Sequence, residues 1–384
     1  MKAWTYTTRG PPSHVLKLRH DLPQPQPTDL HPHEVLIKIS HVSLLAPEHH
    51  FISAFPHPPW PFNNTPWLPG FCFSGTVVAR GSHIHDLDAD TGVDVFGMTD
   101  PMSYPKTNGA LAEYIVVRRD WVATVPRGVS MEEASTLGPP GVTCFAYAEK
   151  AGLIEVANDG DGDGSGPRMV NKGLGKRVLI TGGSTATGLF MLQLARVIVG
   201  EEGVVVTTCS PKHNDAVKAL GADETIDYTT TPNLHAHLTK HYSSTPFDFI
   251  MDITGTDRHL YPKSPAYLHQ NGTFAFAGAM SATHADVPAG LFGFLVFLAG
   301  FLGHLAGWGF NMVWPVVLGG VPRKCFFHSG FPNGRDMELT RQLVAEGKVR
   351  GSVDSVWRMD DGVKAFEYLA TGKVRGKVVV SVRE

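Results

Sequence analysis

A glycine-containing turn in the middle of the chain is the first place where residue types and spacing suggest chemistry. In "VLITGGSTATGLF", residues 178–190, a short apolar strand runs into the turn and an apolar helix follows. Gly183 and Gly188 occupy the outer positions of a Gly-x-Gly-x-x-Gly pattern, and Thr185 replaces its middle glycine. Because unpaired N–H groups at a helix N-terminus bind phosphate, the pattern predicts a nucleotide site. A glycine turn that binds no nucleotide is the alternative interpretation.

The residues of this turn have expected roles. We expect Gly183 to allow the tight turn and Gly188 to let the helix pack close to the sheet. Thr185 narrows the space for a pyrophosphate. The hydroxyls of Ser184, Thr185 and Thr187 can, however, donate hydrogen bonds to phosphate oxygens.

The stretch "TTCSPKHN", residues 207–214, indicates which nucleotide the turn would bind. An NAD site carries Asp or Glu about 20 residues after the turn, to accept from the ribose hydroxyls. No carboxylate stands here, and Ser210 and Lys212 can instead reach a 2′-phosphate, which a lysine attracts and an acid repels. The sequence therefore predicts NADPH as cofactor. Tyr228, after the next predicted strand, is a second expected contact, with a half-buried tyrosine that binds nothing as the alternative.

The sequence gives no sign of a metal site or a disulfide framework. Its four cysteines lie far apart and form no Cys-x-x-Cys pair, which favours a reduced, intracellular setting. His49 and His50 are adjacent but lack a third ligand at a recognisable spacing. The N-terminal "MKAWTYTTRG" has no apolar run, so we expect no signal peptide and a cytoplasmic protein.

Composition bounds the size and the partners. The chain has 384 residues, of which 42% are hydrophobic and 18% charged, enough for two globular domains. The net charge is −3 and no block of Lys or Arg occurs, so a nucleic-acid partner is not expected.

One segment does not resemble an ordinary soluble chain. Residues 287–322 contain no Asp, Glu, Lys or Arg and include "LFGFLVFLAGFLGHLAGWGF". A buried strand and helix that line an apolar pocket or a subunit interface are one interpretation. Membrane contact is another, and association with a membrane is left open. Several glycines and His304 interrupt the run, which disfavours a true membrane span.

The elements that would position these residues fall into two groups. Roughly the first 135 residues are β-rich, with alternating stretches such as "EVLIKISHVSL". The stretch "SMEEASTLGPPGVTCFAYAEKAG" predicts a helix capped by Ser130 and Glu133, a break at Pro139–Pro140 and a second helix. From Arg177, strands alternate with helices, which predicts a parallel, doubly wound sheet.

The ordered motifs "LPGFCFSGTVVARGS", "GVTCFAYAEKAG", "VLITGGSTATG", "LGADETIDY", "FDFIMDITG" and "GKVVVSV" resemble the medium-chain dehydrogenase/reductase superfamily. The chain is most similar to its zinc-free quinone oxidoreductase and enoyl reductase branch, including fungal trans-acting enoyl reductases. The resemblance implies a GroES-like catalytic domain, residues 1–137 and 321–384, with a Rossmann domain inserted at 138–320. It also implies a hydrophobic small-molecule substrate held against the nicotinamide, in a homodimer or a monomer.

The resemblance also implies site residues. The implied cofactor-binding residues are Thr143, Gly183, Ser184, Thr185, Ala186, Thr187, Gly188, Ser210, Lys212, Tyr228, Thr254 and Gly278. Zinc-bearing relatives have a Cys near residues 43–46 and a Gly-His-Glu where this chain has Gly70-Phe71-Cys72, so no zinc is expected.

The chain also departs from its quinone reductase relatives. They carry an Asn-Pro-x-Asp motif, often with a nearby tyrosine, where this chain has Ala46, His49 and Phe51. Reduction of an enone or quinone needs a polarising group or a proton source. His49 or His50 is the candidate donor, and a pair of solvated loop histidines is the alternative.

The leading functional hypothesis is an NADPH-dependent, zinc-independent reductase that adds hydride to an activated C=C bond or a quinone of a hydrophobic substrate, in secondary metabolism. A non-redox biosynthetic enzyme on the same fold, such as a cyclase or isomerase, is the second hypothesis. An NADPH-binding protein that associates with a membrane or a partner, without turnover, is the third.

Overall fold

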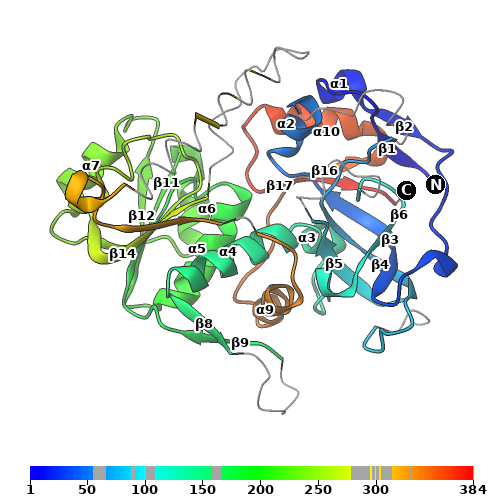
Figure 1. Cartoon of the computed structure of the whole chain (residues 1–384), viewed down its shortest axis with the longest axis horizontal. Helices are drawn as coiled ribbons and strands as arrows, with labels where there is room; N and C mark the ends of the chain where they lie inside the picture. The colour runs from blue at the N-terminus through cyan, green and yellow to red at the C-terminus, as the bar shows by residue number, and fades with distance from the viewer. Residues whose placement is uncertain are drawn as a thin grey trace. The chain divides into compact units, whose positions relative to one another are not determined.

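The computed structural model describes residues 1–54, 66–87, 92–100, 109–157, 166–277, 314–328 and 330–383, with residues 295, 299, 302 and 303. The chain divides into two compact units (Figure 1). The first unit contains Met1–Val142 and Gly330–Glu384. The second contains Thr143–Asp286 and the described part of Leu295–Ser329. The domain boundaries expected at 137/138 and 320/321 stay a prediction.

The first unit is built on an open sheet that joins the two ends of the chain. Among the described residues its strand order is β16-β17-β3-β4-β5-β7, and β6 pairs with β3. Strand β17 lies antiparallel to β3, with Val379 opposite Ser43. Figure 1 shows the two strands in red and blue, the colours of the two ends of the chain. The strands of this sheet are β3 Glu34–Ser43, β4 Cys72–Arg80, β5 Asp94–Met98, β6 Tyr114–Arg118, β7 Val122–Thr124, β16 Val353–Arg358 and β17 Lys377–Ser381. A separate antiparallel pair is formed by β1 Ala3–Thr5 and β2 Lys17–Arg19.

A buried apolar core stabilises this sheet, and short helices accompany it. Val35, Ile37, Phe73 and Val378 belong to one buried apolar core, as the alternation of apolar residues predicts. The helices are α1 Pro12–Val15, α2 Glu48–Ala54, α3 Met131–Ala134, α9 Gly334–Ala345 and α10 Gly362–Ala370, with 3₁₀ turns η1 Pro27–Asp29, η3 Arg119–Trp121 and η8 Met359–Asp361.

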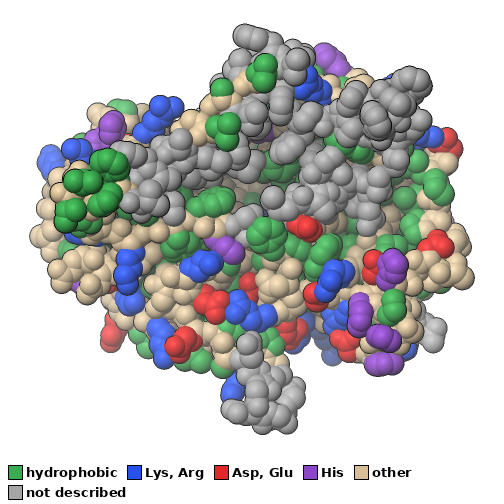
Figure 2. Space-filling model, in the orientation of Figure 1, with side chains coloured by type: hydrophobic (Ala, Val, Ile, Leu, Met, Phe, Trp, Pro, Cys, Tyr) green, Lys and Arg blue, Asp and Glu red, His purple; other side chains and the backbone are tan. Residues whose placement is uncertain are grey.

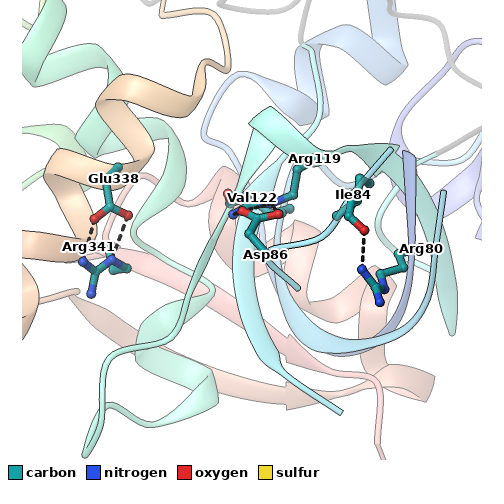
Figure 3. Close-up of polar contacts among 7 residues, drawn as sticks. All are labelled: Arg80, Ile84, Asp86, Arg119, Val122, Glu338 and Arg341. Carbon is teal, nitrogen blue, oxygen red and sulfur yellow. Dashed lines mark hydrogen bonds and ion pairs between the residues drawn. The ribbon is translucent and has the colours of Figure 1, made fainter. Parts of the chain in front are cut away.

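Arginines fasten the turn that follows β4. Figure 3 shows Arg119 beside Asp86 and Val122. Its Nε lies 3.1 Å from Asp86 Oδ1, and its Nη1 donates to Val122 O at 2.9 Å. Arg80 donates to Ile84 O in the same turn (Figure 3). These contacts tie the turn after β4 to the start of β7.

The second unit is a parallel sheet with helices between its strands. Its strand order in the described residues is β12-β11-β10-β13-β14-β15, and every pairing is parallel. The prediction of a doubly wound sheet beside a β-rich domain is therefore confirmed. The elements are α4 Gly138–Lys150, which crosses the unit boundary, β8 Ile154–Ala157, β9 Arg168–Asn171, β10 Arg177–Ile180, α5 Ala186–Val199, β11 Val204–Cys209, η4 Pro211–His213, α6 Asn214–Ala219, β12 Glu224–Asp227, α7 Leu234–Tyr242, β13 Phe247–Asp252, η5 Ser264–Ala266, β14 Leu268–Phe276, η7 Val316–Leu318 and β15 Lys324–Phe327.

The predicted helix break at Pro139–Pro140 is wrong. Helix α4 begins at Gly138 and contains both prolines in its first turn, so the break lies before them, after α3. Proline is tolerated there because first-turn N–H groups have no partner within the helix. The predicted cap is confirmed in one half only. Ser130 Oγ accepts from Glu133 N at 3.2 Å, but the Glu133 carboxylate accepts from Gly351 N.

The described part of the charge-free segment carries exposed apolar side chains. Val316, Val317 and Leu318 form η7, and Val317 is 91% exposed. Figure 2 shows green side chains gathered at the left of the view, where Figure 1 has the orange η7. No helix of the described residues has the length and hydropathy to cross a membrane. Most of residues 287–313 lie outside the described part of the chain.

Candidate functional site

The turn between β10 and α5 is made by a glycine that precedes the expected one. Gly182 has φ +69°, in the left-handed region that glycine adopts without a steric penalty. Its N–H donates to Thr208 Oγ1 at 2.8 Å, and Gly183 N donates to Thr208 O at 2.9 Å. Gly182 is therefore the left-handed residue of the turn, and the role expected of Gly183 in the tight turn stays a prediction. Gly183 does not appear among the glycines with positive φ.

Gly183 and Gly188 are required by close packing. A Cβ at Gly183 would lie 2.2 Å from Thr207 Oγ1 on β11. A Cβ at Gly188 would lie 2.2 Å from Gly182 O, so the first turn of α5 packs directly on the glycine turn. The close packing predicted for Gly188 is confirmed, with the turn itself as its partner. These two close contacts fix the start of α5 against the glycine turn and the neighbouring strand β11.

Thr185 caps the helix. Its Oγ1 accepts from Gly188 N at 3.1 Å and donates to Gly182 O at 2.8 Å. A hydroxyl has one hydrogen, and in this conformation Thr185 Oγ1 directs it to Gly182 O. The expected donation to a phosphate stays a prediction. Ser184, Ala186 and Thr187 are half-buried in the same turn, and their contact with a cofactor stays a prediction.

The ends of β11 and β12 lie side by side, because Cys209 pairs with Asp227. Ser210 follows β11 and is nearly buried, whereas Lys212 in η4 is exposed. The Asp227 carboxylate accepts from Thr229 N at 2.9 Å and from Thr229 Oγ1 at 2.7 Å. These bonds turn it toward its own loop and lower the pKa of Asp227. Beyond the end of β11 the chain thus places the exposed Lys212 and the nearly buried Ser210 hydroxyl. The Asp227 carboxylate lies at the end of the neighbouring β12.

Two further predicted cofactor residues differ in their settings. Tyr228 is 55% exposed, more than the half-buried tyrosine of the alternative interpretation. Thr143 is half-buried at the unit boundary in α4, and its neighbour Cys144 donates through Sγ to Thr187 O at 3.6 Å. Gly278 lies outside the described residues. Their contact with a cofactor stays a prediction.

A buried aspartate at the end of β13 fastens the loop beside the glycine turn. Asp252 Oδ1 accepts at 2.7 Å from Oγ1 of Thr181, the residue that follows β10, and at 3.0 Å from Gly255 N. Burial raises the pKa of Asp252. A Cβ at Gly182 would lie 2.7 Å from Thr254 Cγ2, so Thr254 lies against the turn. Strand β10 lies between β11 and β13, the place where α/β sheets bind ligands.

In the first unit, the two predicted catalytic histidines lie on α2. His49 Nδ1 is 2.7 Å from Ala46 O, and the His49 and His50 rings have centroids 3.7 Å apart. Because a carbonyl only accepts, this contact assigns the hydrogen to Nδ1 and leaves Nε2 as an acceptor in the neutral ring. Burial lowers the pKa of His49, which favours that neutral form. A proton-donating role for either histidine stays a prediction.

Glu48, the residue before them, was missed by the sequence analysis. It is 0% exposed, and its carboxylate accepts from Gly70 N and, at 3.2 Å, from Leu45 N. Burial raises the pKa of Glu48 to about 7. Lys377 on β17 is 4% exposed, with Nζ 3.8 Å from Cys72 Sγ, and its charge acts on both Glu48 and Cys72. We call Glu48, Cys72 and Lys377 the buried cluster.

The residues at this place do not fit zinc. Phe71 and Cys72 stand where zinc-bearing relatives have a histidine and a glutamate, and the Cys72 thiol faces the Lys377 ammonium. Both oxygens of Glu48 already accept from backbone N–H groups. The described residues contain no group of three or more His, Cys, Asp or Glu side chains arranged to hold a metal ion. Burial, with Glu48 beside it, raises the pKa of the Cys72 thiol, which disfavours the thiolate that zinc binds.

Comparisons with known proteins agree with this architecture. Residues 31–127 match the alcohol dehydrogenase GroES-like domain, and residues 220–380 match the zinc-binding dehydrogenase family. The chain is 31% identical to the medium chain reductase pydE of an Acremonium species, covering 100% of this chain and 99% of the relative. It is 30% identical to the trans-enoyl reductase poxH of Penicillium oxalicum, covering 100% and 98%. The quinone oxidoreductase structure from Coxiella burnetii has a TM-score of 0.69 at 25% identity, covering 100% and 99%.

Proposed function

The chain belongs to the medium-chain dehydrogenase/reductase superfamily of nicotinamide-dependent oxidoreductases, and we propose that it is an NADPH-dependent, zinc-independent reductase. Its proposed reaction is hydride transfer to an activated C=C bond or a quinone of a hydrophobic substrate in secondary metabolism. The names of the relatives, trans-enoyl reductases and quinone oxidoreductases, support this substrate class. The observation that carries the cofactor proposal is the glycine turn, with Lys212 beyond the end of the next strand.

The second unit would hold the cofactor by its backbone. Gly182, Gly183 and Gly188 pack tightly on their neighbours and so fix the start of α5 at the turn. The pyrophosphate would lie at the N-terminus of α5, where N–H groups and the helix dipole favour an anion. Lys212, which is exposed beyond the end of β11, would pair with the 2′-phosphate, because a lysine attracts this group. The bound cofactor supplies the hydride, and the protein supplies its orientation.

Zinc independence is supported by the buried cluster. The ammonium of Lys377 lies 3.8 Å from the Cys72 sulfur, and a second cation there would be repelled. We propose that EDTA leaves the turnover of the purified protein unchanged.

The activity is tested by turnover of the purified full-length chain. NADPH oxidation is followed with 1,2-naphthoquinone and with a long-chain α,β-unsaturated ketone, and the reduced product is quantified. We expect one NADPH consumed for each product formed with at least one acceptor. Product without NADPH consumption would support a non-redox enzyme, and cofactor binding without turnover of either acceptor would support a binding protein.

We further propose that η7 is a contact surface between two copies of the chain. Its apolar side chains are exposed, and it precedes β15, the edge strand of the described sheet. Apolar surface of this kind marks interfaces. Light scattering should give the mass of a dimer, and Val317→Asp should give a monomer. A monomeric wild-type chain that sediments with phosphatidylcholine vesicles would instead support membrane contact.

A further inference from the structure

Helix α4 carries a buried side chain that none of the proposed cofactor contacts uses. Tyr147 is 1% exposed, and its hydroxyl oxygen lies 2.7 Å from Phe276 O and 2.7 Å from His328 O. His328 N lies 3.2 Å from the same oxygen. One hydroxyl therefore links the last residue of β14 to the residue that follows β15.

The surroundings of Tyr147 keep this link in place. Its ring stacks on Phe326 of β15, with centroids 5.3 Å apart and planes 29° from parallel. Burial raises the pKa of Tyr147, so its hydroxyl keeps its hydrogen near neutral pH. That hydrogen goes to one carbonyl at a time, while the oxygen can accept from His328 N. Phe276 is also paired with Phe327 in the ladder of β14 and β15, so the hydroxyl extends the link between the two strand ends by one residue, to His328.

These strand ends belong to the edge of the sheet that the proposed cofactor would occupy. Strands β10, β13, β14 and β15 are parallel, so their C-terminal ends share one edge. Strand β11, with Lys212 beyond it, lies on one side of β10, and β13, β14 and β15 lie on the other. With the 2′-phosphate at Lys212, the residues at the ends of β14 and β15 would serve the nicotinamide half, because a dinucleotide spans both halves of such a sheet.

We propose that Tyr147 is a positioning residue for the nicotinamide half of the cofactor, acting through the spacing of the ends of β14 and β15. The proposal rests on the proposed function. Tyr147 contacts the protein, and its effect reaches the cofactor through the backbone at Phe276 and His328. Helix α4 also contacts the first turn of α5, beside it in Figure 1, through Cys144. One helix thus supports both halves of the proposed cofactor site.

Two substitutions distinguish a positioning role of Tyr147 from a general contribution to the stability of the second unit. Tyr147→Phe keeps the ring and its stacking on Phe326 and removes the hydroxyl. Tyr261→Phe is the matched control, because the Tyr261 hydroxyl donates to Arg323 O at 2.9 Å, just before β15 begins. It removes the same kind of bond at the other end of the same strand. NADPH and adenosine 2′,5′-bisphosphate, the adenosine half with its 2′-phosphate, are titrated into each full-length protein.

We expect Tyr147→Phe to weaken NADPH binding about five- to tenfold, and adenosine 2′,5′-bisphosphate binding by less than about twofold. Tyr261→Phe should change neither. With 1,2-naphthoquinone as acceptor, the KM for NADPH should rise in Tyr147→Phe and not in Tyr261→Phe.

Three outcomes would overturn the proposal. Unchanged NADPH binding in Tyr147→Phe would show that the hydroxyl does not position the cofactor. Equal weakening of NADPH binding and adenosine 2′,5′-bisphosphate binding would indicate a general loosening of the second unit. Failure of the wild-type chain to bind either ligand would overturn the proposed cofactor and this proposal together. The first two results leave the proposed function standing, so the two failures are distinguishable.

Discussion

The glycine turn of the second unit and the buried cluster of the first organise their surroundings by opposite means. The turn, residues 182–188, contains no ionisable side chain and is shaped by backbone contacts and one hydroxyl cap. The buried cluster consists of ionisable groups in a dry interior, and Cys72 and Lys377 are 305 residues apart. We therefore expect the turn to be sensitive to steric volume and insensitive to pH. We expect the cluster to be sensitive to pH and insensitive to steric volume.

The largest effect should be on the pH dependence of stability through Glu48. Its pKa is about 7 in the folded chain and 4.5 ordinarily. Between these values the folded protein holds a proton that the unfolded chain has released, so the free energy of unfolding falls as the pH rises from about 4.5 to about 7, by roughly 3 kcal/mol. Glu48→Gln should abolish most of that fall, as measured by urea unfolding at pH 5 and pH 7.5.

The exposed Glu367 on α10 offers the matched control. Glu367→Gln should leave the difference between the two pH values at its wild-type size. An unchanged difference in Glu48→Gln would show that the buried carboxyl does not carry the pH dependence, and the contrast between the two regions would fail.

The second effect tests volume at the turn. Gly183→Val should weaken NADPH binding about 100-fold or more, because its side chain meets Thr207 at the start of the proposed phosphate site. Nicotinamide fluorescence measures the affinity. Gly334→Ala on α9, where a Cβ would have its nearest neighbour at 3.5 Å, should leave binding and stability near wild type. Wild-type affinity in Gly183→Val would remove the turn from the cofactor site.

A smaller effect is expected at Thr185. Thr185→Ala loses the cap of α5 and should lower the free energy of unfolding by about 1 kcal/mol, whereas Thr185→Ser should retain it. NADPH affinity should change by less than about threefold in both, because the hydroxyl serves the helix. A tenfold loss of affinity with no loss of stability would assign the hydroxyl to the phosphate after all.

The smallest effect concerns a carboxylate outside the dry interior. On α9, Arg341 Nε donates to Glu338 Oε2 at 2.7 Å, and both side chains are about one third exposed (Figure 3). Glu338→Gln should cost about 0.3 kcal/mol, because solvent screens such pairs. Denaturant unfolding at low and high salt measures it. A loss of roughly 3 kcal/mol, the size of the pH effect expected from Glu48, would show that burial is not what separates the two carboxylates.

The sequence predicted the parts of the molecule that depend on local patterns. Alternating apolar residues predicted strands of the first sheet, and strands that alternate with helices predicted the second. Gly183 and Gly188 located the turn from their spacing. Gly182 was missed because the spacing pattern counts from the following glycine, although the left-handed residue is the one before it. Glu48 was missed because its surroundings come from distant parts of the chain. Gly70 N donates to its carboxylate, and the charge of Lys377, near the C-terminus, acts on it. No local pattern contains such a contact.

The account's central claim is an NADPH site at the glycine turn with Lys212 on the 2′-phosphate. The most direct test is a titration of wild-type protein and Lys212→Ala with NADPH and with NADH, followed by nicotinamide fluorescence. We predict that wild type binds NADPH at least about tenfold more tightly than NADH, and that Lys212→Ala loses this preference while keeping its NADH affinity. Equal affinity for the two cofactors in wild type, or a preference that survives Lys212→Ala, would contradict the claim.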